Sequence, residues 1–197
     1  MNTTQDIATS RALGILAKRP VFIDTETTGL NSTAQICEIT VLDTDGTVLL
    51  DTLVKPTVPI SEGAAAVHGI DDEAVANAPT FVNVFEQFCN ATRDRLILMY
   101  NAKFDIRMIR QTALAHGLLS QLPESVSASG CAMLFYASYF TNSGRWQKLS
   151  EAADQQNIAQ PDDLHRSLAD TELTRRLFHA MAGQAETTWL QENNNGK

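Results

Sequence analysis

The chain has 197 residues, of which 44% are hydrophobic and 19% charged, and its formal net charge is −8. This length and composition predict one globular domain with a sizeable core and favour it over two small domains. No apolar run approaches the roughly 18 residues of a membrane span, and the first twenty residues lack the features of a signal peptide. We therefore expect a cytoplasmic protein without a membrane partner.

The cysteines and the net charge narrow the possible kinds of site. Cys37, Cys89 and Cys131 are widely spaced and form no CxxC pair, which argues against a structural zinc site and a disulfide framework. The negative charge opposes non-specific binding to nucleic acid. It does not exclude a small acidic metal site, because bound cations invert the local charge.

Periodicity predicts the elements in chain order. Helices are expected over residues 5–18, 80–92, 102–117, 146–157 and 167–183, with a loop and short helix over 59–75. Strands are expected over residues 20–24, 35–43, 47–56, 95–100 and near 126–131. Asp45-Gly46 is a hairpin turn signal, and Thr80 is a candidate helix cap.

The order of these elements predicts the architecture. A three-strand meander is followed by helices that alternate with strands, which is typical of an α/β sandwich with a mixed sheet and helices on both faces. The single domain is expected to span residues 1–185. Residues 186–197 are expected to form a flexible tail.

Two acids stand at the end of the first strand, in "VFIDTETTGL". The i, i+2 spacing of Asp24 and Glu26 puts both carboxylates on one side of the strand, where they repel each other. Such a pair is a candidate metal site, although it could also simply face water.

Asp105, which follows the predicted central strand, is a third candidate metal ligand, because strand ends at one sheet edge converge on a crevice. A helix-start carboxylate that is stabilised by the helix dipole is the alternative.

The segment "HRSLAD" supplies a histidine and a fourth acid. On a straight helix, five residues correspond to a rotation of about 500°, so His165 and Asp170 would not share a face. They can converge only if His165 precedes the final helix. A surface loop histidine is the alternative for His165.

The segments "DTETTGL", "NAKFD" and "HRSLAD" together resemble the three motifs of the DEDDh 3′–5′ exonucleases. This family includes the proofreading subunit of bacterial DNA polymerase III, exonuclease X, RNase T and oligoribonuclease. The motifs stand in the family's order within residues 21–178, and "VHGI" at 67–70 also matches. The resemblance implies an RNase H-like fold, with a mixed five-stranded sheet flanked by helices.

The resemblance also implies two Mg²⁺ or Mn²⁺ ions, which need oxygen ligands such as carboxylates. By analogy with the family, Asp24 bridges both ions, Glu26 and Asp170 bind the first, and Asp105 holds the second through water. His165 then removes the proton from the attacking water, which suits a side chain that titrates near neutral pH.

Six residues are expected, from the resemblance, to contact the 3′-terminal nucleotide or to brace its pocket: Thr27, Thr28, Leu30, His68, Asn101 and Phe104. The main chain around Thr27 and Thr28 would hold the nucleotide. Leu30 would wedge against its base, and His68 would contact the nucleotide or its phosphate. For Leu30 and Phe104, core packing is the competing interpretation.

Two positions depart from the family's pattern. The stretch "SGCAMLF" stands where the family often has Asp-Thr, which leaves the role of Ser129-Gly130-Cys131 open. Gly63 stands where some relatives place a binding glutamate. "GRWQKLSEAA" is most similar to the exonuclease X side of the family. Neither departure removes a metal ligand.

The resemblance favours a stand-alone 3′–5′ exonuclease that acts on single-stranded DNA and releases nucleoside 5′-monophosphates. An exoribonuclease that trims RNA 3′ ends is one alternative. A non-catalytic nucleic-acid-binding or replisome-tethering module is the other. The expected partner is a nucleic acid 3′ end; a DNA polymerase and a second copy of the chain, as a homodimer, are left open.

Overall fold

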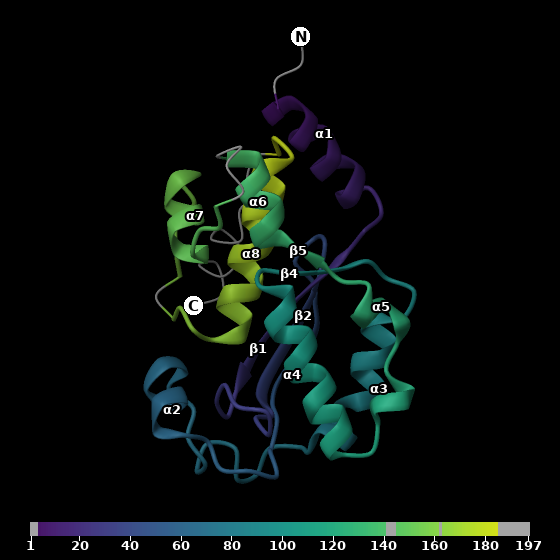
Figure 1. Cartoon of the computed structure of the whole chain (residues 1–197), viewed down its shortest axis with the longest axis vertical. Helices are drawn as coiled ribbons and strands as arrows, with labels where there is room; N and C mark the ends of the chain where they lie inside the picture. The colour runs from purple at the N-terminus through teal and green to yellow at the C-terminus, as the bar shows by residue number, and fades with distance from the viewer. Residues whose placement is uncertain (1–3, 141–144, 162, 185–197) are drawn as a thin grey trace, which may run out of the picture.

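The computed structural model describes residues 4–140, 145–161 and 163–184. At its centre is a mixed sheet with the strand order β3-β2-β1-β4-β5 (Figure 1). The strands are β1 (Val21–Thr27), β2 (Ile36–Asp43), β3 (Val48–Leu53), β4 (Ile97–Met99) and β5 (Gly130–Cys131). β1, β2 and β3 pair antiparallel, as the predicted meander requires, whereas β4 runs parallel to β1 and β5 parallel to β4. The predicted mixed five-stranded sheet is confirmed.

Helices cover both faces of this sheet. They are α1 (Thr4–Leu16), α2 (Glu62–His68), α3 (Phe81–Thr92), α4 (Ala102–Ala115), α5 (Glu124–Ser127), α6 (Ala132–Phe140), α7 (Leu149–Gln155) and α8 (Ser167–Met181). Helices α3 and α4 pack on one face, and α8 packs on the other beside α1, α6 and α7. Among the described residues, no helix is both long and apolar enough to cross a membrane.

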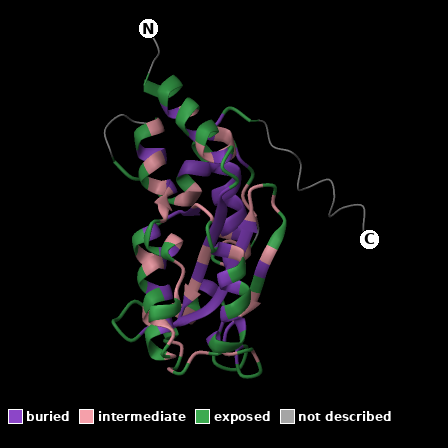
Figure 2. Cartoon of the chain, turned by 90° about the vertical axis from the view of Figure 1, so that its right-hand side faces the viewer, coloured by how far each residue is buried: buried purple, intermediate pink, exposed green. Residues whose placement is uncertain are grey.

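Side-chain alternation along β1 divides the core between these two faces. Val21 and Ile23 belong to the cluster that contains α3 and α4, whereas Phe22 belongs to the cluster around α8. The rings of Phe22 and Phe178 meet edge to face with centroids 6.1 Å apart, and Phe135 lies 5.1 Å from Phe178. Figure 2 shows the buried residues concentrated in the sheet and on the helix faces that contact it. These contacts fix α8 against β1, the two elements that carry the acidic motifs.

Local chemistry explains several of the boundaries. Thr80 is the residue that caps α3, and its backbone N–H donates to Asn83 Oδ1 at 3.1 Å. Gly46 has a φ of 91° in the β2–β3 turn, as the Asp-Gly signal predicts. The helix predicted over 5–18 is present as α1, but Ile7 and Leu13 of its apolar pattern are exposed.

The segment before α6 differs from its prediction. Residues 126–131 were expected to be extended, yet α5 ends at Ser127 and only Gly130 and Cys131 form strand. A side chain at 130 would place its Cβ 2.8 Å from Leu98 Cδ2, so the close pairing of β5 with β4 favours glycine.

The helix expected over 146–157 is shorter in the structure, because α7 begins at Leu149. The tail expected at 186–197 lies outside the described residues.

We expect Phe178→Ala to lower the free energy of unfolding by about 3–5 kcal/mol, because it leaves a cavity between α8 and β1. Urea denaturation followed by circular dichroism measures this change. Leu134→Ala, at a side chain that is 56% exposed on α6, is the control and should change stability by less than about 0.5 kcal/mol. Equal effects of the two substitutions would contradict the role given to Phe178.

Candidate active site

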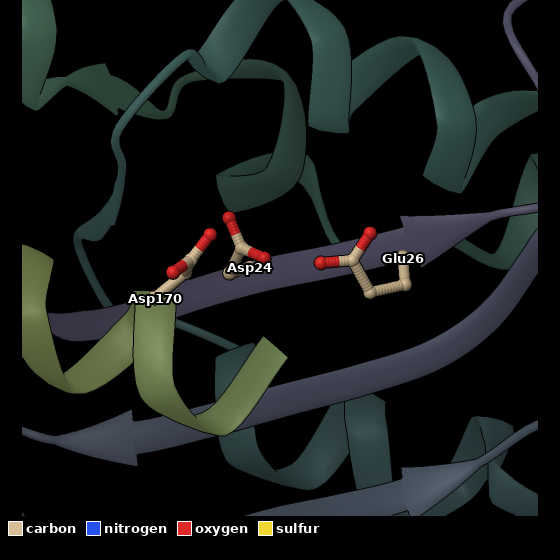
Figure 3. Close-up of side chains that lie close together, drawn as sticks. All are labelled: Asp24, Glu26 and Asp170. Atoms are coloured by element: carbon tan, nitrogen blue, oxygen red, sulfur yellow. The ribbon is translucent and has the colours of Figure 1, made fainter. Parts of the chain in front are cut away.

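Three carboxylates meet where β1 passes the beginning of α8. Asp24 and Glu26 alternate with buried residues on β1 and project on the same side as Phe22, toward α8. Asp170 lies in the first turn of α8. One carboxylate oxygen from each of the three residues lies within 4.8 Å of the other two, and Figure 3 shows the three side chains gathered from the strand and the helix. The predicted convergence of Asp24, Glu26 and Asp170 is therefore present in the structure.

Burial and mutual repulsion act on this cluster. Burial, and then the charges of Asp105 and Asp170, raise the pKa of Asp24 well above its usual range. Burial and neighbouring carboxylates, Asp170 first among them, raise the pKa of Glu26 to about 8. Burial also raises the pKa of Asp170, although His165 opposes the shift. Carboxylates in this environment favour a partner of positive charge.

Asp105 reaches the site from the other side of β1. It is buried in the first turn of α4, and its Oδ1 accepts a hydrogen bond from Thr25 Oγ1 at 2.9 Å. Burial raises the pKa of Asp105 to about 7, and the Thr25 hydrogen bond opposes the shift. Asp105 is not one of the three carboxylates that meet within 4.8 Å. It lies near enough to Asp24 to be the strongest charge acting on the pKa of that carboxyl.

A fourth carboxylate, Glu38, faces the cluster but has its own partners. Glu38 pairs with Glu26 across β1 and β2, so the two side chains share a face. Its carboxylate accepts from Arg166 Nε at 3.2 Å and from the Ser167 backbone N–H at 2.9 Å. Arg166 Nη2 also donates to it in an ion pair. Glu38 thereby ties the beginning of α8 to β2, which the sequence analysis did not identify.

His165 stands before α8, as the spacing argument requires. Arg166 is the cap residue of α8, and His165 adopts a left-handed conformation with a φ of 67°. Its backbone N–H lies 3.4 Å from Asp170 Oδ1. Its imidazole is exposed and makes no hydrogen bond with a side chain or backbone group of the described residues. His165 is therefore next to the cluster, and its ring is free to turn toward a substrate.

A cavity of 420 Å³ opens beside the carboxylates. Its lining includes Glu26, Thr27, Leu30, His68 and Phe104 together with the first turns of α2. Leu30 is 75% exposed, so core packing does not explain it. The cavity shares Glu26 with the acidic cluster, which places a partly apolar pocket directly beside the charged one.

His68, another residue that was predicted to contact the nucleotide, forms hydrogen bonds within the fold. His68 is buried, and its Nδ1 accepts from the Ile70 N–H, so Nε2–H donates to the Thr27 carbonyl at 3.1 Å. Burial lowers the pKa of His68, which favours this neutral form. The ring braces the end of β1 as well as lining the cavity.

Thr28 and Asn101 lie outside the cavity lining. The Thr28 backbone N–H donates to the Gln35 carbonyl at 2.8 Å, and the Thr28 carbonyl accepts from the Ser61 N–H at 3.0 Å. The prediction that the main chain of Thr28 holds a nucleotide gains no support from these bonds. Asn101 is exposed and its carbonyl accepts from the Phe104 N–H at 2.8 Å, which is consistent with the predicted bracing of the loop.

Gly63 lines the cavity, and there is open space where a side chain at this position would extend.

Comparison with known proteins agrees with this geometry. A family described as Exonuclease matches residues 21–178. An uncharacterized exonuclease, CP81 of Escherichia phage 186, is 39% identical over 192 residues, which cover 92% of this chain and 97% of that protein. A DNA polymerase III subunit epsilon-like protein of Rhodobacter capsulatus is 29% identical over 181 residues, but these cover 25% of that longer protein.

Solved structures share the fold. Exonuclease X in complex with 5′ overhanging duplex DNA has a TM-score of 0.61 and 26% identity, covering 84% of this chain and 93% of that one. The nuclease domain of 3′hExo, a DEDDh family member bound to rAMP, has a TM-score of 0.63 at 16% identity, with 84% and 92% coverage. With the family match over most of the chain, these likenesses identify the protein as a member of the exonuclease family.

Proposed function

We propose that the chain is a metal-dependent 3′–5′ exonuclease that removes nucleoside 5′-monophosphates from the 3′-OH end of single-stranded DNA. The observation that carries this proposal is the acidic cluster beside the cavity, with Glu26 common to both. A terminal nucleotide in the cavity would place the phosphodiester bond on its 5′ side next to the carboxylates. Cleavage there releases one nucleotide at a time.

The chemistry of the ligands fits hard divalent cations. The cluster offers only carboxylate oxygens, which Mg²⁺ and Mn²⁺ prefer. Burial and the neighbouring carboxylates raise the pKa values of Asp24 and Glu26, and neither side chain forms an ion pair among the described residues. Asp24, Glu26 and Asp170 would hold the first of two ions, with Asp24 shared and Asp105 supporting the second. Such ions neutralise the charge that develops on the phosphate during hydrolysis.

The residues of the chain then have distinct roles. His165 accepts the proton of the attacking water, because its backbone N–H beside Asp170 Oδ1 holds the residue next to the cluster and its exposed side chain has no competing hydrogen bond with a described residue. Leu30 and Phe104 hold the terminal base between apolar surfaces. Glu38 and Arg166 keep the loop that carries His165 in place.

The preference for DNA rests on the relatives. Exonuclease X, the solved neighbour with 26% identity, was captured with DNA, and the Rhodobacter capsulatus relative is named after a DNA polymerase subunit. This second name also supports a polymerase as a partner. The presence of every expected catalytic side chain favours an enzyme over a binding or tethering module.

The polarity of cleavage tests the proposal directly. A 5′-labelled single strand should shorten into a ladder with Mg²⁺ or Mn²⁺, and a 3′-terminal label should appear at once as a mononucleotide. EDTA should stop the reaction, and a matched RNA strand measures the preference for DNA. Internal fragments at early times, 3′-phosphate products or full activity in EDTA would each contradict the proposed function.

His165→Ala and Asp170→Asn should both lower the nuclease activity, but for different reasons. Loss of the proton acceptor should lower turnover by about 10²–10⁴-fold while metal affinity changes little. Loss of the Asp170 charge should weaken metal binding directly, because it removes a carboxylate from the cluster. Titration of Mn²⁺ against residual activity, together with calorimetry, separates the two effects. A His165→Ala variant that loses metal affinity but keeps its turnover at saturating Mn²⁺ would refute this assignment.

The metal-free protein should become less stable as pH rises from about 4.5 to about 8. The folded pKa of Glu26 lies above its ordinary 4.5, so in this window the folded state binds more protons than the unfolded state. Glu26→Gln should remove part of this slope and raise stability at pH 8 by on the order of 2 kcal/mol.

Urea denaturation across this pH range, in EDTA and in Mg²⁺, measures the effect. Mg²⁺ should stabilise the wild type at pH 8 more than it stabilises Glu26→Gln. Glu86→Gln, which neutralises an exposed carboxylate on α3, is the matched control and should leave the slope unchanged. An identical slope in wild type and Glu26→Gln would show that the Glu26 charge is not repelled.

A further inference from the structure

The wall that α2 contributes to the cavity consists mostly of small residues. Ser61, Gly63, Ala64 and Val67 line the cavity together with His68. A Cβ added at Gly63 would meet no heavy atom of another described segment within 4 Å. The backbone of Gly63 does not have a positive φ, so a side chain at this position is sterically allowed. The space in front of Gly63 is therefore a feature of the residue type and not of a strained backbone.

Hydrogen bonds at both ends hold α2 against the end of β1. The Ser61 N–H donates to the Thr28 carbonyl at 3.0 Å, and His68 donates to the Thr27 carbonyl at 3.1 Å. Figure 1 shows this short helix at the edge of the molecule. Because both of its ends are bonded to the same segment of chain, α2 cannot move inward to fill the space at Gly63 without breaking these bonds.

The same contacts give the cavity a direction. His68 stands at the end of α2 that is bonded to β1 beside the carboxylates. At the other end, Ser61 Oγ would lie 3.4 Å from a Cβ at Gly29. Gly63 follows Ser61 by two residues, so it faces the part of the cavity near Leu30. This is the part where the proposed function places the terminal base.

The lining at this end favours apolar groups. Glu26 is the one charged side chain among the described residues that line the cavity, because burial lowers the pKa of His68 and keeps it neutral. Ala64, Val67 and Leu30 present methyl groups, and the last two are exposed. Contact with such a surface removes apolar ligand atoms from water. A ligand group in front of Gly63 is therefore expected to be apolar.

We propose that the cavity accepts a 3′-terminal nucleotide whose base carries a bulky apolar substituent, and that Gly63 leaves the space for this substituent. The inference rests on the proposed function, which places the terminal nucleotide in the cavity. A space of roughly 150 Å³ accommodates a benzene-sized group, and the whole cavity has a volume of 420 Å³. The substrates would then include strands that end in an alkylated base, and hydrolysis would release the modified nucleoside 5′-monophosphate.

The test fills the space at Gly63 and compares two strands that differ only in the 3′-terminal base. Both strands carry a 5′ label; one ends in adenine, and the other in adenine with a benzyl group on its exocyclic amine. The wild type should cleave the benzylated end with a kcat/KM within about tenfold of the value for the unmodified end. In Gly63→Leu, the ratio of the benzylated to the unmodified kcat/KM should fall by about tenfold or more, because overpacking a preformed site excludes the larger group.

Two further variants make the comparison specific. Leu and Ala both have higher helix propensities than Gly, so Gly63→Leu and Gly63→Ala should keep the fold. Gly63→Ala adds a single methyl group and should lower the ratio less than Gly63→Leu does. Gly14→Leu is the matched control, because Gly14 is an exposed residue of α1 with the same open space and lies outside the cavity lining. Its ratio should equal that of the wild type.

Two outcomes of the cleavage assay would overturn the proposal. An unchanged ratio in Gly63→Leu would show that the substituent does not occupy the space in front of this residue. A wild type that cleaves the benzylated end with a kcat/KM lower by much more than about tenfold would show that the cavity rejects the substituent.

A binding measurement separates this inference from the proposed function. Fluorescence anisotropy with 5′-dye-labelled strands in Ca²⁺, which carboxylate oxygens also bind, reports the cavity whether or not the wild type cleaves DNA. A loss of affinity in Gly63→Leu that is larger for the benzylated strand supports the proposal even if no cleavage is found. Equal affinities of Gly63→Leu and the wild type for the benzylated strand refute it even if the enzyme is active. Absence of binding to either strand would refute both proposals.

Discussion

The repulsion among carboxylates at one end of β1 is the constraint to which the surrounding structure responds. Asp24, Glu26 and Asp170 each place one carboxylate oxygen within 4.8 Å of the others in a partly buried site. Their charged forms repel one another and disfavour the fold. The packing of Phe22 against Phe178 holds β1 and α8 together in spite of that repulsion. The apolar core is therefore what keeps the acidic cluster together against its own charge.

Hydrogen bonds and ion pairs distinguish the carboxylates that stabilise the fold from those of the acidic cluster. Glu38 faces the same side as Glu26, yet it is bound by Arg166 and by the first backbone N–H of α8. Asp105 accepts from Thr25, which alternates with Asp24 along β1 and so points to the opposite face. The same residue type thus ties a helix to a strand at one position and joins a cluster of carboxylates at another.

Local periodicity predicts most of the fold, and the resemblance to the exonuclease motifs predicts the acidic cluster, but long-range pairing decides the rest. The i, i+2 spacing of Asp24 and Glu26 and the position of His165 before a helix could be interpreted from the sequence alone, because each depends on one element. The Glu38–Arg166 pair joins residues 128 positions apart, so only the packing of α8 against β2 reveals it. The beginning of β5 was not predicted correctly, since the pairing of Gly130 with Leu98 depends on two distant segments.

Net charge is a poor guide to a protein whose charges are segregated. A value of −8 opposes binding to nucleic acid when charge is averaged over the surface. Here the acids meet in one cluster, where divalent cations would reverse their effect, whereas the exposed Lys103, Arg107 and Arg110 lie on one side of α4. Helical spacing in the sequence indicates that the α4 cations share a face. Only the fold shows that Arg107 lies over the ring of Phe104, which lines the cavity beside Glu26, so that the basic face of α4 adjoins that cavity.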